Sequence, residues 1–171
     1  SAWTMPYAFN LPFVELGDRQ FSSNLLGAAF TGEWEPAAEL VGGESRYAYA
    51  FEWDEYYAPR AAYRLQEAGV KIKVATAPFS ALTNLGVKEF DYGTIMIPLG
   101  VQDNQERVHK LVKQVVSNDG ISVFNITTGL STAGVDLGSN QFESLDMPKV
   151  AVVGGEGTNA YEIGEMWHLL D

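Results

Sequence analysis

The stretch TIMIPLGVQDNQERVHKLVKQVVSNDGISVFNITTG, residues 94–129, decides the fold class, because it contains a strand, a helix and a second strand in succession. Residues 94–100 are mostly apolar, which is typical of a strand covered on both faces and therefore central in a sheet. A helix follows, capped by Asp103 or Asn104 and closed by residues Asn118 to Gly120. Its apolar positions have helical spacing: Val108, Leu111, Val112, Val115 and Val116. The stretch therefore predicts an α/β fold.

The alternation of strand and helix continues on both sides of this stretch. A further helix includes Pro59, which suits only a first helical turn, and ends before Gly69. The last helix begins at Thr158 or Asn159, where Asn159 and Glu162 have the spacing of a capping box. Further strands are predicted over residues 47–53, 70–76, 121–129 and 150–155. Because no strand follows the last helix before Asp171, we expect the domain to be incomplete at its C-terminus.

Residues 1–45 have no sustained period and are predicted to form an irregular arm. Prolines and glycines interrupt them, and their aromatic side chains include Trp3, Phe9, Phe13, Phe21, Phe30 and Trp34. We expect these aromatic side chains to be buried against another surface. The chain is therefore expected to divide into an arm, 1–45, and an α/β domain, 46–171.

The composition excludes several classes of partner and of chemistry. The chain has 11 Lys and Arg against 22 Asp and Glu, a net charge of −11, so nucleic acids and anionic membrane surfaces are poor partners. No apolar run reaches the roughly 18 residues of a membrane span, so no membrane insertion is expected. The chain has no cysteine, which excludes disulfides, thiolate metal ligands and a cysteine nucleophile.

The first candidate site is the sequence GGEGTN, which consists of Gly154, Gly155, Glu156, Gly157, Thr158 and Asn159. It lies between a predicted strand and a predicted helix, where free backbone N–H groups can hold a carboxylate or a phosphate. The spacing lacks the full dinucleotide-binding pattern and the lysine of a phosphate loop, and Glu156 would repel a phosphate. A tight structural turn is favoured over a small-molecule site, and a nucleotide site is the weakest of the three.

Two carboxylates and a group of hydroxyls are the other candidates. Glu52 and Glu156 occupy matching strand ends, where a pair facing one crevice could perform acid–base chemistry. The favoured alternative is that each carboxylate accepts hydrogen bonds from the first turn of the following helix. Thr127, Thr128 and Ser131 follow another predicted strand, and loop capping explains these hydroxyls better than a serine nucleophile does.

The two histidines complete neither a catalytic nor a metal site. His109 lies within the predicted helix that starts at Asp103 or Asn104, away from any serine nucleophile pattern. His168 and Asp171 are three positions apart on the last helix, but a third protein ligand for a metal cannot be identified. The sequence therefore predicts no catalytic residue and no metal ligand.

Several strings resemble the region after the catalytic domain in large bacterial zinc carboxypeptidases of the carboxypeptidase A type. The strings are AWTMPYAFNL (2–11), YAFEW (49–53), AAYRLQEAGVKIKVA (61–75), TTGLSTAGVDLGSN (127–140) and VAVVGGEGTNAYEIGEMWHLLD (150–171). The resemblance covers nearly the whole chain, and the closing string is its most specific part. In that family the region belongs to, and leads into, a class I glutamine-amidotransferase-like domain.

The resemblance implies a flavodoxin-like or amidotransferase-like fold, a mostly parallel sheet with flanking helices. The family's zinc ligands and catalytic glutamate lie in the preceding domain, and no position here matches them. The family's amidotransferase-like fold normally carries a cysteine nucleophile, which this chain lacks. The resemblance therefore implies no cofactor in this segment, zinc in a parent peptidase domain, and a periplasmic or secreted parent.

Three functions are carried forward. The leading hypothesis is a non-catalytic accessory domain of a zinc metallocarboxypeptidase, which braces the peptidase domain of the same parent chain or shapes its cleft. The alternative is a small-molecule or peptide-binding module with a pocket at the strand C-terminal ends, lined by Glu52, Thr127, Thr128 and residues 154–159. Its acidic residues would favour amines, cationic peptides or a divalent cation. The third is an independent hydrolase with Glu52 or Glu156 as its base.

Overall fold

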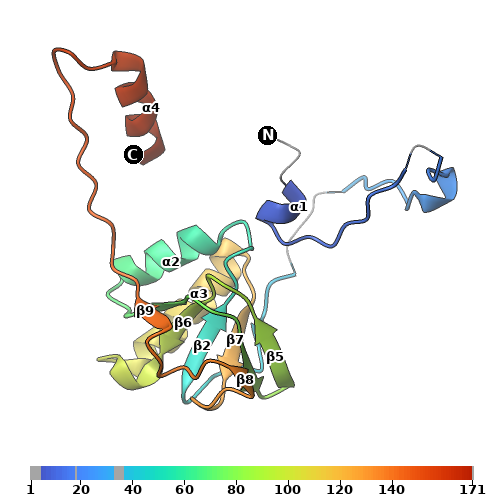
Figure 1. Cartoon of the computed structure of the whole chain (residues 1–171). Coiled ribbons are helices and arrows are strands. Elements are labelled where there is room, and N and C mark those ends of the chain that lie inside the picture. The colour runs from blue at the N-terminus through green and yellow to red at the C-terminus, as the bar shows by residue number, and fades with distance from the viewer. Residues whose placement is uncertain (1–4, 18, 33–36, 171) are drawn as a thin grey trace.

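The computed structural model describes residues 5–17, 19–32 and 37–170, and these form a mixed α/β fold with two sheets and four α-helices. Figure 1 shows α2 (Ala58–Glu67) and α3 (Gln105–Asp119) packed beside the sheets. Helices α1 (Met5–Ala8) and α4 (Ala160–Leu170) lie apart from this body, towards the two ends of the chain (Figure 1). Two short 3-10 helices cover Ser23–Leu25 and Leu99–Val101.

The larger sheet has six strands in the order β1-β7-β2-β6-β3-β9. Their bounds are Leu40–Val41 (β1), Ala48–Phe51 (β2), Lys73–Ala75 (β3), Ile95–Pro98 (β6), Val123–Ile126 (β7) and Phe142–Ser144 (β9). The smaller sheet has the order β5-β4-β8. Its strands are Phe79–Thr83 (β4), Gly86–Phe90 (β5) and Ala133–Gly134 (β8).

The expectation of a mostly parallel sheet is wrong. In the described part of the chain β1 and β7 are the one parallel pair, whereas β2 runs antiparallel to both β6 and β7, and β3 runs antiparallel to both β6 and β9. Both pairings of the smaller sheet are antiparallel as well.

The reason is that two strand–helix–strand units are interleaved. The first unit is β2–α2–β3 and the second is β6–α3–β7, and the order β7-β2-β6-β3 places one strand of each unit between the two strands of the other. Neighbouring strands therefore come from different units and run in opposite directions. This is the split βαβ arrangement of ferredoxin-like folds. The sequence pattern of strand, helix and strand is the same whether or not another strand lies between.

The core lies on both faces of the larger sheet. Tyr49 and Phe51 of β2 face α2 and α3, while Ala48 and Ala50 face the smaller sheet. All four residues are fully buried, because successive strand residues point to opposite faces and both faces are covered. Burial on both faces also explains the apolar character of β6, whose position between β2 and β3 confirms the prediction of a central strand.

The boundaries of α3 and α4 follow the predicted capping signals, whereas Asp54 does not cap α2, whose N-cap is Tyr57. The Asn104 side chain accepts a hydrogen bond from the Arg107 N–H at 3.0 Å, so Asn104 is the N-cap of α3. Gly120 ends α3 in the left-handed conformation, with φ of 64°. At α4 the Asn159 side chain accepts from the Tyr161 N–H at 3.0 Å, which confirms the predicted start of the last helix.

One hairpin was not predicted, and one predicted strand does not form. The hairpin β4–β5 was not expected, although FSALTNLGVKEF (79–90) alternates in its first half and has Asn84 and Gly86 in the turn. The strand expected over 150–155 is absent from the structure, and these residues are exposed. A β-branched run forms a strand only beside a partner, and β9, the edge strand before it, pairs with β3.

The arm remains outside the core in its described part. Residues 5–17 and 19–32 are exposed except for Pro6 and Phe9, which are half-buried. The Phe9 ring stacks on the Tyr56 ring with 5.9 Å between the centroids. The described part of the chain therefore does not bury the aromatic side chains of the arm as expected. Trp3 and Trp34 lie outside the described residues. Strand β1 belongs to the larger sheet although it falls within 1–45.

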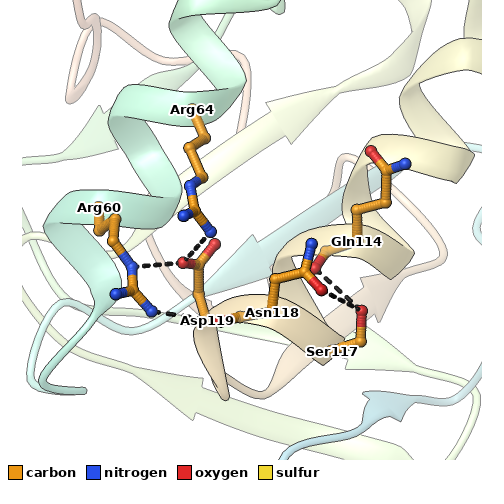
Figure 2. Close-up of polar contacts among 6 residues, drawn as sticks. All are labelled: Arg60, Arg64, Gln114, Ser117, Asn118 and Asp119. Carbon is orange, nitrogen blue, oxygen red and sulfur yellow. Dashed lines mark hydrogen bonds and ion pairs between the residues drawn. The ribbon is translucent and has the colours of Figure 1, made fainter.

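A buried carboxylate joins α2 to α3. Figure 2 shows Arg60 and Arg64 reaching from α2 to Asp119, the last residue of α3. Asp119 Oδ1 accepts from Arg60 Nε and from Arg64 NH1, each at 2.5 Å. The Asp119 side chain is fully buried, and its Oδ2 atom has no hydrogen-bond partner in the structure. The two helices that cover the sheet are therefore held together at the end of α3.

Candidate functional site

The antiparallel sheet separates Glu52 from Thr127, two residues that were predicted to line one pocket at the C-terminal ends of the strands. Strand β7 is paired to β2 with Ala48 opposite Ile126, so Thr127 follows at the end of the sheet where β2 begins. Glu52 follows the other end of β2. The structure therefore places Thr127 and Glu52 at opposite ends of the sheet.

The predicted hydroxyl groups form hydrogen bonds with backbone groups. The Thr127 hydroxyl donates to the Leu82 carbonyl at 2.9 Å, and the Thr128 hydroxyl accepts from the Leu130 N–H at 3.3 Å. The Ser131 hydroxyl donates to the Val135 carbonyl, on the other side of β8, at 2.6 Å. These bonds support the interpretation of loop capping over that of a nucleophile.

Residues 154–159 form a closed turn apart from the sheets (Figure 1). The Gly155 N–H donates to the Thr158 hydroxyl at 3.0 Å, and that hydroxyl donates to the Gly155 carbonyl at 2.7 Å. Gly154, Glu156 and Gly157 are exposed, and Glu156 lines none of the cavities that border Glu52. The structure therefore does not bring Glu52 and Glu156 together, which removes the crevice that the hydrolase hypothesis needs.

Acidic and aromatic side chains gather instead at one end of the larger sheet. The turn EWDEYY, residues 52–57, joins β2 to α2 at this end, and the turn before β6 contributes Asp91 and Tyr92. Because β6 and β7 run opposite to β2, their amino ends meet the carboxyl end of β2 here. We call this region the acidic end of the sheet.

Glu52 borders a cavity of about 490 Å³ at the acidic end. The cavity lies against the smaller sheet and is also lined by Ser80, Glu89 and Asp91. The Lys88 ammonium bonds a Glu52 carboxylate oxygen at 2.9 Å and lies 5.1 Å from the centroid of the Phe90 ring. The Glu52 carboxylate therefore already has a cationic partner.

Glu55 borders a second cavity, of about 620 Å³. It is lined by Ala37, Ala38, Glu55, Tyr56, Tyr57, Gly120 and Ser122, and we call it the Glu55 cavity. Both carboxylate oxygens of Glu55 accept from the Ser122 N–H, at 3.0 and 3.1 Å. Burial raises the pKa of Glu55, the Ser122 N–H opposes that rise, and the nearby charges of Asp54 and Glu52 add to it.

Sequence reasoning missed Glu55. The signal was present, since the turn after β2 holds Glu52, Asp54 and Glu55 within four residues. What the sequence does not reveal is that Ser122, which is remote along the chain, lies beside Glu55. That neighbour follows from the pairing of β7 with β2.

The structure offers little for a metal ion or for acid–base chemistry at a histidine. Within the described ranges no group of three or more His, Asp or Glu side chains is arranged to hold a metal. His109 Nδ1 lies 2.7 Å from the Tyr49 hydroxyl, which in turn accepts from the Ser45 N–H at 3.0 Å. The predicted weak pair of His168 and Asp171 extends beyond the described residues. None of the helices in the described part is both long and apolar enough to cross a membrane.

Comparison of the chain with models of protein families, with curated proteins and with solved structures finds no match.

Proposed function

We propose that this chain is a non-catalytic accessory module of a zinc-dependent carboxypeptidase, which braces the peptidase domain of the same parent chain. The observation that carries the proposal is the exposed arm. Its large apolar side chains lie outside the core, with Tyr7, Phe21 and Phe30 exposed by 74%, 67% and 70%. Apolar surface of this extent is characteristic of a segment that packs on another protein surface.

The chemistry of the partner follows from the resemblance. Zinc and the catalytic glutamate belong to the parent peptidase domain, and a periplasmic or secreted location goes with that parent. The arm precedes the sheet, and the family's catalytic domain precedes the resembling region. An arm that covers the peptidase domain would explain why aromatic side chains are exposed in this chain.

The flavodoxin-like or amidotransferase-like part of the resemblance is proposed for residues 150–171 alone. Their β-branched run lacks a partner strand among the described residues, and Trp167 of α4 is 69% exposed. A strand and helix of this kind are stabilised when they join a sheet that covers them.

The test has two stages. The reading frame that encodes this chain should also encode a zinc-peptidase motif upstream, and a frame without one would refute the parentage. Titration calorimetry should then detect binding between the chain and that peptidase domain. Replacing Phe13, Phe21 and Phe30 together by Ser should weaken binding at least about tenfold, since buried aromatic side chains dominate interfaces. The control Leu130→Ser, at a residue 70% exposed outside the arm, should leave binding unchanged. Zinc-dependent hydrolysis of peptide C-termini by this chain alone would contradict a non-catalytic role.

A second candidate function is a small-molecule or peptide-binding module that uses the cavity beside Glu52. Its volume of about 490 Å³ lies within the usual range of ligand pockets. Thermal-shift measurements with amines and short basic peptides test it, because a ligand at 100 times its Kd adds about 2.7 kcal/mol of stability. Glu52→Gln should remove any shift, and an unchanged shift in that variant would place the binding elsewhere.

A further inference from the structure

The Glu55 cavity differs from the Glu52 cavity in that its carboxylate has no cationic partner in the part of the chain that the structure describes. In the described part of the chain the ion pairs involve Glu52, Glu44, Asp103 and Asp119, and none involves Glu55. Among the described residues, the hydrogen-bond donor to the Glu55 carboxylate is the Ser122 N–H, a single donor shared between the two carboxylate oxygens. Each carboxylate oxygen can accept two hydrogen bonds, so the group retains accepting capacity towards the cavity.

The aromatic walls suit a cation on an apolar body. The Tyr56 and Tyr57 rings stand at 88° to one another with their centroids 4.8 Å apart. The Arg60 guanidinium lies 3.8 Å from the centroid of the Tyr57 ring, which is a cation–π contact within the protein itself. Tyr56 is 71% exposed, so part of its ring is open to a ligand although the Phe9 ring stacks on it.

The C-terminal end of α3 also favours a positive ligand beside Glu55. The cavity is lined by Gly120, the C-cap of the 15-residue helix α3, and a helix C-terminus carries a partial negative charge. The remaining wall is formed by the small residues Ala37 and Ala38, which leave room for an apolar group.

We propose that the Glu55 cavity binds an organic cation, an ammonium or guanidinium group attached to an apolar or aromatic body, with Glu55 as its counter-ion. The cavity volume of about 620 Å³ accommodates a ligand of small-molecule size. The same chemistry is present in free amines and in the basic side chains of peptides. The proposal does not depend on the accessory role or on the Glu52 cavity.

The experiment compares ligands of one shape and different charge. The wild-type chain is titrated with benzyltrimethylammonium, benzylamine, benzyl alcohol and benzoate, and binding is followed by the shift of the Ser122 amide signal in two-dimensional NMR spectra. The two cations should bind and should move the Ser122 signal, while the neutral and anionic compounds should bind at least about tenfold more weakly. A second arm replaces benzylamine by arginine amide and by a short Lys-containing peptide, which distinguishes a free amine from a peptide as the source.

Variants assign the effect to Glu55. Glu55→Gln keeps an oxygen that accepts from Ser122 and removes the charge, so it should weaken cation binding at least about tenfold, or about 1.4 kcal/mol. Tyr56→Leu should weaken benzyltrimethylammonium more than benzylamine, because the quaternary ion cannot donate a hydrogen bond. The control Glu106→Gln removes an exposed carboxylate in the first turn of α3 and should have no effect.

Three outcomes would overturn the proposal. The first is equal affinity for benzylamine and benzyl alcohol. The second is unchanged cation binding in Glu55→Gln while its spectrum remains that of the folded chain. The third is the absence of any shift at Ser122 with cations at concentrations up to about 10 mM.

Discussion

The ion pairs of Asp119 with Arg60 and Arg64, which we call the clamp, join α2 to α3. They predict that Asp119→Ala lowers the stability of the wild type but raises the stability of a variant that lacks both arginines. Asp119 is fully buried, whereas its partners Arg60 and Arg64 are 41% and 45% exposed. Removing Asp119 leaves two guanidinium groups that can turn to water. Removing both arginines leaves a buried carboxylate without a counter-ion. The two changes break the same contacts but leave very different charges behind.

The magnitudes follow from these exposures. Arg60→Met with Arg64→Met should lower the free energy of unfolding by about 3–5 kcal/mol, the usual effect of leaving a buried charge unpaired. Asp119→Ala should lower it by only about 0–2 kcal/mol, because exposed partners are rehydrated and because Oδ2, which is already unsatisfied, is removed with the carboxylate. Adding Asp119→Ala to the double Met variant should restore stability, since it removes the unpaired charge.

Urea unfolding followed by circular dichroism measures the free energy of unfolding of the wild type, the double Met variant, Asp119→Ala and the triple variant. In thermal unfolding, the double Met variant should melt roughly 6–20 °C below the wild type. The control is Asp103→Ala, which breaks the exposed Lys71–Asp103 pair and should change stability by less than about 0.5 kcal/mol. The reasoning is refuted if Asp119→Ala destabilises the double Met variant, or if it costs more alone than the two Met substitutions do together.

Three further predictions concern Glu55, the glycine Gly42 and the exposed segment 146–159. Because burial raises the pKa of Glu55 in the folded chain, the wild type should lose stability relative to Glu55→Gln as the pH rises through that raised pKa, and urea unfolding between about pH 4 and about pH 8 measures the difference. Gly42→Ala should be more destabilising than Gly43→Ala by about 1–3 kcal/mol, since both glycines have positive φ but only a Cβ at Gly42 meets the Asn125 side chain; equal losses would contradict the clash. Brief trypsin digestion should cut at Lys149, in the exposed segment 146–159, before any site within the larger sheet, which mass spectrometry detects.

Local structure was predictable because its causes are local. The strands over 47–53, 70–76, 94–100 and 121–129 and the helix caps at Asn104 and Gly120 are all confirmed, with each strand shorter than its sequence pattern. Apolar spacing and capping residues act within a few positions, so the sequence contains them directly. The strand expected over 150–155 does not form, because a strand needs a partner strand as well as β-branched residues, and the partner is not a local feature of the sequence.

The sheet order could not be read from the same signals. A strand–helix–strand unit joins two parallel strands by a right-handed crossover. The residues of the unit do not specify whether another strand lies between these two strands. Here β2 lies between β6 and β7, and both run antiparallel to it. The assumption that all strands end at the same edge of the sheet is therefore wrong, and so is the pocket predicted from it. Thr127 and Glu52 were grouped by that assumption, and it gave no reason to expect Ser122 beside Glu55.

The interleaved sheet also explains why the charge of Glu55 remains available. It brings the end of α3 beside the turn that follows β2, so Asp119 at that helix end comes within reach of α2. Asp119 binds Arg60, and the bound guanidinium lies over the Tyr57 ring, on the border of the Glu55 cavity. A cationic side chain in this position would otherwise be a natural partner for Glu55. The bonds to Asp119 therefore join the two helices and engage Arg60, and among the described residues Glu55 has no ion-pair partner.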